Sequence, residues 1–116
     1  MHIEIDIDIF SGRPNPSWML GPAEAEELMT HLRQHRLPPS DDPQPQLGLG
    51  FRGFVLHQTD AYGRMHPWLW VGGGTISVLT GSARRNFRDI VGLEDWLVEL
   101  AKRAGYGALL NDVGKR

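Results

Sequence analysis

The stretch His2-Ile3-Glu4-Ile5-Asp6-Ile7-Asp8-Ile9-Phe10 decides the fold, because isoleucines and acidic residues alternate along it without a break. A period of two is typical of a β-strand that buries one face. The sequence therefore predicts a strand over residues 2–10 with its isoleucines in the core. Glu4, Asp6 and Asp8 then line the opposite face of the sheet, which no predicted helix covers.

A proline-rich segment, Ser11-Gly12-Arg13-Pro14-Asn15-Pro16-Ser17-Trp18, follows this strand. Its prolines fix φ and extend the residues before them, so the segment is stiff. We interpret it as a loop that presents polar groups in a fixed order, in which Arg13 and Asn15 can bind an anion or a carboxylate. The alternative is a structural role, with Arg13 bonded to loop carbonyls or paired with Asp6 or Asp8.

Two amphipathic helices are predicted further along the chain. The first covers residues 22–36, with a proline at its start, acidic residues in its first turns and apolar residues at helical spacing. The second covers residues 92–104 and ends at Gly105. Residues 37–46 contain four prolines and almost no apolar side chain, so we expect a surface excursion there.

Three further strand regions lie between the helices, at Leu47–Gln58, Trp68–Val71 and Thr75–Leu79. The triple glycine Gly72–Gly74 reads as a tight hairpin turn. The segment Gly81–Arg88 carries three arginines, and we interpret it as a solvated loop. The resulting order β-α-β-β-β-α predicts an α+β two-layer sandwich, with about four mostly antiparallel strands and two helices on one face.

Length and composition narrow the class of protein. The 116 residues suit one domain over residues 1–116, and that length supports a core without a staple. The absence of cysteine excludes disulfides and thiolate chemistry. A net charge of −2 gives no attraction to nucleic acid. With no secretion signal and no apolar run long enough for a bilayer, we expect a cytoplasmic protein without a membrane partner.

His57, Asp60 and His66 are the candidates for catalysis or metal binding. They suit a small metal set, or a histidine base oriented by a carboxylate. Their spacing crosses a predicted turn, which permits their approach but does not require it. No nucleophile elbow, metalloprotease helix motif or dinucleotide loop is present. We therefore lean towards a non-enzymatic protein and expect neither a metal nor a cofactor.

The chain resembles a group of small uncharacterised microbial proteins that carry an SGRPNPxW motif, an LG(Y/F)RGF motif and an acidic-Trp-Leu segment. The matching stretches here are Ser11–Trp18, Leu49–Phe54 and Glu94–Leu97. Phe51 stands where tyrosine is expected, and Asp95 where arginine is expected. The resemblance implies no established activity, but it raises the expectation of joint action by Arg13, Asn15, Trp18 and Arg52.

The leading hypothesis is a small binding or accessory protein that recognises a peptide or a small anionic ligand. Polar recognition is assigned to Arg13, Asn15 and Arg52, and an apolar wall to Trp18, Trp68 and Trp70. If Trp68 and Trp70 join the acidic residues on the uncovered sheet face, that face is a ligand groove or the surface of a homodimer.

Several alternatives remain open at this point. The tryptophans can instead face the core, with the acidic residues only limiting aggregation. A small enzyme is the second hypothesis, with His57 or His66 as the acid/base and Arg13 holding an anionic substrate. A purely structural interaction module is the third.

Overall fold

The computed structural model describes residues 2–8, 16–34, 36–40 and 53–112. Its first strand, β1 (Ile3–Asp8), alternates as its sequence predicts. The three isoleucines are 1%, 0% and 0% exposed, and the acidic residues between them are half-buried. The prediction of a strand with one buried face is therefore confirmed, and residues 9 and 10 lie outside the described part.

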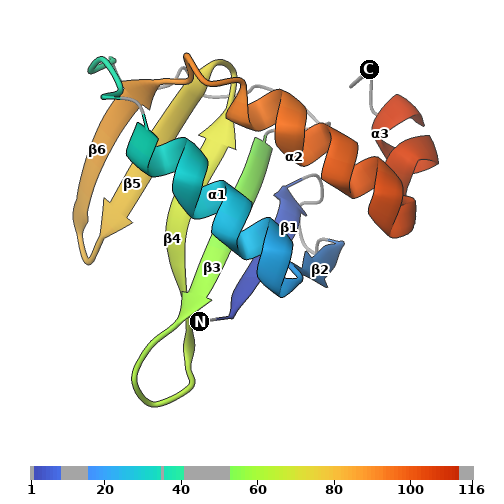
Figure 1. The fold of residues 1–116 in the computed structure, drawn as a ribbon, viewed down its shortest axis with the longest axis horizontal. Helices are drawn as coiled ribbons and strands as arrows, with labels where there is room; N and C mark the ends of the chain where they lie inside the picture. Colours follow the sequence, from blue (N-terminus) through green and yellow to red (C-terminus); the bar gives the residue numbers. More distant parts are fainter. Residues whose placement is uncertain (1, 9–15, 35, 41–52, 113–116) are drawn as a thin grey trace.

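The sheet has six strands in the order β2-β1-β3-β4-β5-β6, and every neighbouring pair is antiparallel (Figure 1). The other five strands are β2 (Ser17–Met19), β3 (Gly53–Thr59), β4 (Met65–Gly72), β5 (Thr75–Thr80) and β6 (Ala83–Arg88). Gly73 and Gly74 adopt positive φ between β4 and β5, as a tight glycine turn requires. The α+β class is confirmed, whereas the expected number of about four strands is wrong.

The two strands that the sequence analysis missed lie at the edges of the sheet. β2 has only three residues, too few to show a period of two, and it forms by pairing with β1. The prediction of a loop over Gly81–Arg88 is wrong, because residues 83–88 form β6. Its charges are compatible with a strand because the arginines of β6 are exposed, and edge strands tolerate charged residues.

The helices α1 (Pro22–Gln34) and α2 (Leu93–Ala101) cross the same face of the sheet (Figure 1). A π-type turn, η1 (Lys102–Tyr106), and the short helix α3 (Gly107–Asp112) follow α2. Gly105 has φ 100° and breaks the helix where the sequence predicted its end. The core fills the space between the sheet and the helices, and Leu28, Leu97 and Leu110 are each 0% exposed.

The start of the predicted surface excursion, at residues 38–40, covers the outer edge of β6. The Arg88 N–H donates to the Pro38 carbonyl at 2.8 Å, and the Ser40 N–H donates to the Asn86 carbonyl at 3.0 Å. These bonds occupy backbone groups that an edge strand otherwise leaves open to other chains. Residues 41–46 of the predicted excursion lie outside the described part.

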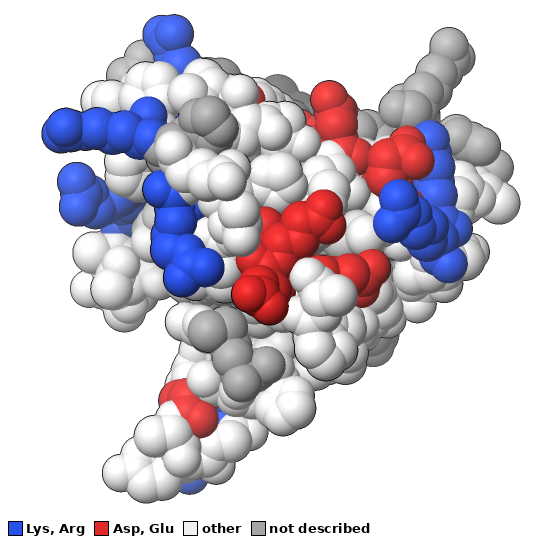
Figure 2. All heavy atoms as spheres, viewed as in Figure 1, with Lys and Arg blue, Asp and Glu red and all other residues white. Residues whose placement is uncertain are grey.

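The face that carries the helices also separates its charges. Figure 2 shows acidic side chains gathered over the middle of this face and near α2, and basic side chains in two groups on its opposite sides, one towards β6 and one towards α3. The acidic residue of the first turn of α1 is Glu24, where the helix dipole favours negative charge. Within the described residues, no helix combines the length and the apolar character that a membrane span needs.

Candidate functional site

The open face of the sheet, meaning the face turned away from α1 and α2, carries a row of side chains across all six strands. Because the isoleucines of β1 point to the core, Asp6 points to the open face. The strand registers continue the row from β2 to β6 as Ser17, Asp6, Val55, Trp70, Ser77 and Asn86. The row therefore has an acidic end at β1 and a polar end at β6.

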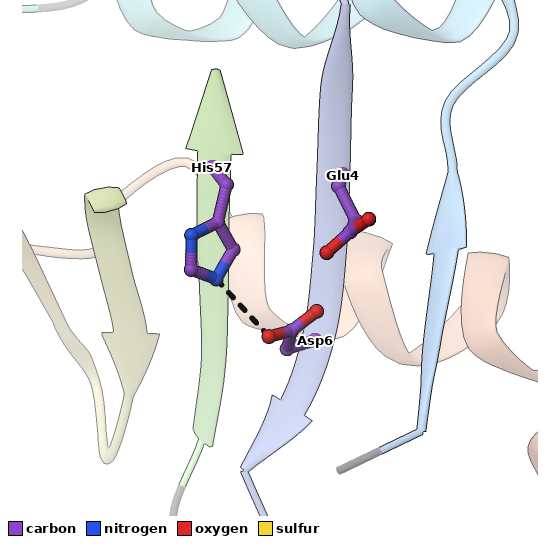
Figure 3. Close-up of side chains that lie close together, drawn as sticks. All are labelled: Glu4, Asp6 and His57. Carbon is purple, nitrogen blue, oxygen red and sulfur yellow. Dashed lines mark hydrogen bonds and ion pairs between the residues drawn. The ribbon is translucent and has the colours of Figure 1, made fainter. Parts of the chain in front are cut away.

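A cluster of Glu4, Asp6 and His57 occupies the acidic end. Glu4 lies opposite His57 in the β1–β3 pairing, and Figure 3 shows the imidazole leaning towards Asp6. The His57 Nε2–H donates to Asp6 Oδ2 at 3.1 Å across 51 positions of sequence. One ligand-type atom from each of the three side chains lies within 4.8 Å of the other two. Two rigid strands thus bring an imidazole and two carboxylates to one point.

The electrostatics of this cluster are unbalanced. Burial raises the pKa of Glu4, the hydrogen bond and the charge of Asp6 raise it further, and His57 acts in the opposite direction. With Glu4 ionised, Asp6 Oδ1 is buried and has no hydrogen-bond partner among the described residues. The neighbours of these acids on β2, Ser17 and Met19, carry no positive charge. The cluster therefore favours a bound proton or cation.

A second histidine–aspartate pair lies in the β3–β4 connection. The His66 Nε2–H donates to Asp60 Oδ2 at 2.7 Å, while Asp60 Oδ1 accepts the N–H groups of Tyr62 and Arg64 at 2.8 and 2.9 Å. These hydrogen bonds, led by that of Arg64, lower the pKa of Asp60. Asp60 and His66 thus pair as the sequence analysis allowed, but His57 contacts Asp6 instead of joining them.

The tryptophans named as a binding wall occupy both faces of the sheet. The ring of Trp18 packs against the core at 6.5 Å from Phe54 and 5.8 Å from Tyr106. Trp68 also packs against the core and lines a hollow of about 280 Å³ near the end of α1. A bulge in the β3–β4 pairing displaces Trp68 from simple alternation with Trp70. Only Trp70 of these three belongs to the row on the open face.

Trp70 forms a platform for Arg84. The Arg84 guanidinium lies 5.8 Å from the centre of the Trp70 ring. Its Nη2 donates to Ser77 Oγ and its Nε donates to Asn86 Oδ1, both at 3.2 Å. A Cβ at position 53 would lie only 3.1 Å from the Trp70 ring, so Gly53 leaves room for the indole in this position. The structure therefore holds one exposed guanidinium in a defined orientation.

The remaining predicted binding residues, Arg13, Asn15 and Arg52, lie outside the described residues. The alternation along residues 2–10 correctly placed Glu4 and Asp6 on the open face. It did not predict that His57 joins them, because that depends on the register between β1 and β3. Arg84 was missed because its strand was interpreted as a loop.

Comparison of the chain with protein-family models, with curated proteins and with solved structures finds no match. The resemblance to small microbial proteins that share its motifs therefore stays a prediction.

Proposed function

We propose that this chain is a small non-enzymatic binding protein that recognises an anionic group, the carboxylate of a peptide or of a small molecule, at Arg84 and Trp70. The observation that carries the proposal is the fixed guanidinium of Arg84. It is exposed, and yet a ring contact with Trp70 and hydrogen bonds to Ser77 and Asn86 orient it.

A fixed guanidinium is well suited to a carboxylate. Arginine offers five N–H donors in a planar fork that matches the two oxygens of a carboxylate. The bonds to Ser77 and Asn86 use Nη2 and Nε, and the described residues offer no acceptor to Nη1. Because the side chain is already oriented, less conformational entropy is lost when a ligand binds. The Trp70 ring adds an apolar surface beside the charge.

The sequence supplies the other parts of the proposal. Arg13, Asn15 and Arg52 stay proposed as additional polar contacts on the strength of their motifs. Trp18 and Trp68 are not needed, because they pack on the core side. The same open face is also the surface on which we propose that a homodimer forms.

The test compares two neighbouring arginines of β6. Phenylacetate is titrated into the protein, with phenylacetamide as the uncharged ligand, and the Trp70 indole and Arg84 Nε–H signals are followed by NMR. Arg84→Gln is expected to weaken phenylacetate binding by about tenfold or more, since a bidentate charge-assisted contact is lost. Arg85→Gln is the matched control, because Arg85 lies over Phe87 and opposite Val78, away from the row.

The outcomes separate specific recognition from charge attraction. Binding of phenylacetate alone, lost in Arg84→Gln and kept in Arg85→Gln, supports the proposal. Equal losses in both variants, or no shift of the Trp70 and Arg84 signals at millimolar phenylacetate, contradict it. Native mass spectrometry of the same samples gives the oligomeric state.

A second candidate function is a small enzyme, and the orientation of His57 by Asp6 favours it. A histidine held by a carboxylate is a suitable general base. Turnover of a panel of small esters that is lost in His57→Asn and kept in Arg84→Gln would support this candidate over the binding protein.

A further inference from the structure

We propose that Glu4, Asp6 and His57 form a binding site for a divalent transition-metal ion, with Zn²⁺ as its probe. The site is separate from the anion site proposed above. The Arg84 guanidinium lies over Trp70 on β4, and β4 is two strand spacings from β1, which corresponds to roughly 10 Å.

The donor set and its spacing suit such an ion. Zn²⁺ binds imidazole nitrogen and carboxylate oxygen at about 2.0–2.2 Å, which places ligand atoms about 3.0–3.4 Å apart around one ion. The three candidate atoms already lie within 4.8 Å of one another. Binding draws these atoms closer together, and the His57 ring nitrogen that ligates the ion carries no proton in the bound state.

An independent observation is the second oxygen of Asp6. Asp6 Oδ2 accepts the hydrogen bond of His57, whereas Oδ1 is buried and, while Glu4 is ionised, has no hydrogen-bond partner among the described residues. Buried polar atoms in folded proteins are almost always paired with protein, water or an ion. This buried carboxylate oxygen lies beside two other side chains that can bind a metal, and it is therefore available as a ligand.

The surroundings of the acids add a further argument. Glu4 lies between Met19 and His57, and Asp6 lies between Ser17 and Val55. None of these four neighbours carries a fixed positive charge, so none of them offsets the repulsion between the two carboxylates. A divalent cation supplies the missing charge. The imidazole favours a transition metal over Mg²⁺ or Ca²⁺, which prefer oxygen ligands alone.

The second histidine–aspartate pair provides a control within the same chain. Asp60 uses both its oxygens in hydrogen bonds to Tyr62, Arg64 and His66. In the part of the chain that the structure describes, Glu4, Asp6 and His57 are the one group of three metal-type side chains that converge. A histidine–aspartate contact alone is therefore not expected to hold the ion.

The experiment is a calorimetric titration of tag-free, chelator-treated full-length protein with Zn²⁺. We expect one ion per chain and no binding of Mg²⁺. His57→Ala is expected to weaken Zn²⁺ binding by about 100-fold or more, since removal of even an outer partner of a ligand weakens metal binding 10- to 100-fold. His66→Ala, the matched control, is expected to bind as the unaltered chain does.

A second variant guards against loss of folding. Glu4→Gln removes one of two repelling carboxylates, so it keeps the fold and is expected to weaken Zn²⁺ binding by about tenfold. Substoichiometric Mn²⁺ gives a positional readout, because it broadens the NMR ring signals of His57 more than those of His66.

Three results would overturn the proposal: no binding at millimolar Zn²⁺, equal losses in His57→Ala and His66→Ala, or unchanged affinity in both His57→Ala and Glu4→Gln. Arg84→Gln is expected to bind Zn²⁺ normally. The Zn²⁺ titration can therefore be interpreted even if the carboxylate-binding proposal for Arg84 is wrong.

Discussion

The two faces of β1 differ in how favourably their side chains interact with their surroundings. On the core face Ile3, Ile5 and Ile7 are almost fully buried against other apolar residues. On the open face Glu4 has a raised pKa, and one Asp6 oxygen is buried without a hydrogen-bond partner among the described residues. One strand thus stabilises the fold on one side, and on the other side it carries the polar groups of the proposed site. Single substitutions should therefore separate stability from binding.

The largest effect is expected on the core face. Ile5→Ala removes a side chain that is 0% exposed and should lower the free energy of unfolding by about 2–5 kcal/mol, because a cavity adds to the lost burial. Urea denaturation measures it. Ile90→Ala is the control, since Ile90 is 56% exposed, and a change within about 0.5 kcal/mol is expected. Equal losses would show that the core face is not better packed than the surface.

A smaller loss of stability is expected at Gly53, which contacts the Trp70 ring. In Gly53→Ala the new Cβ lies 2.7 Å from the Val71 carbonyl oxygen, at φ 145°. We expect a loss of about 1–3 kcal/mol, together with a changed near-ultraviolet signal from Trp70. Gly63→Ala also has positive φ, but its Cβ would meet nothing within 4 Å. Gly63→Ala should therefore lower the free energy of unfolding by less and leave the Trp70 signal unchanged. A larger loss in Gly63→Ala than in Gly53→Ala would contradict the close contact between Gly53 and Trp70.

A gain in stability is expected from a substitution within the cluster of Glu4, Asp6 and His57. Glu4→Gln should raise the free energy of unfolding at neutral pH by less than about 1 kcal/mol, because Glu4 is a partly exposed group with like charge beside it. The raised pKa means that the folded chain binds this proton more tightly than the unfolded chain does. The contribution of Glu4 is therefore complete below the ordinary value of 4.5 and is lost as pH rises through the folded pKa.

Denaturation curves from acid to neutral pH check this sign. The variant and the unaltered chain should be close in stability in acid and should diverge in favour of Glu4→Gln as pH rises. A variant that is less stable at neutral pH would mean that the Glu4 carboxylate already has a partner.

The smallest effect, with the opposite sign, is expected at Asp60. The pKa of Asp60 is lowered, so its charge stabilises the fold above the ordinary value of 3.8, and this is lost as pH falls through the folded pKa. Asp60→Asn should therefore be slightly less stable at neutral pH and should match the unaltered chain in strong acid. The effect is small because Asp60 is exposed and the amide oxygen still accepts the Tyr62 and Arg64 N–H groups. A gain at neutral pH would contradict it.

The sequence was most informative where a pattern was long enough to repeat. Six alternating residues identified β1 and its two faces, and helical spacing identified α1 and α2. The edge strands were missed for physical reasons. β2 is three residues long, and β6 carries exposed arginines, which hide the alternation of a strand.

The candidate site could be predicted only in part for a similar reason. The acidic half follows from alternation within β1, which is a local property. The position of His57 depends on the pairing Glu4↔His57, which is set by contacts distant in sequence. The seat of Arg84 depends likewise on the pairing of β4, β5 and β6, which aligns Trp70, Ser77 and Asn86.

The strand order also has a kinetic consequence. β3, β4, β5 and β6 pair with their neighbours along the chain, so residues 53–88 close through short loops. The β1–β3 seam joins positions such as Asp6 and His57, 51 residues apart, and pairings of that separation form late because a long loop must close first. The cluster of Glu4, Asp6 and His57 spans this seam. An ion bound there would act on the contact that closes last, so its occupancy should appear as slower unfolding, with little change in the folding rate.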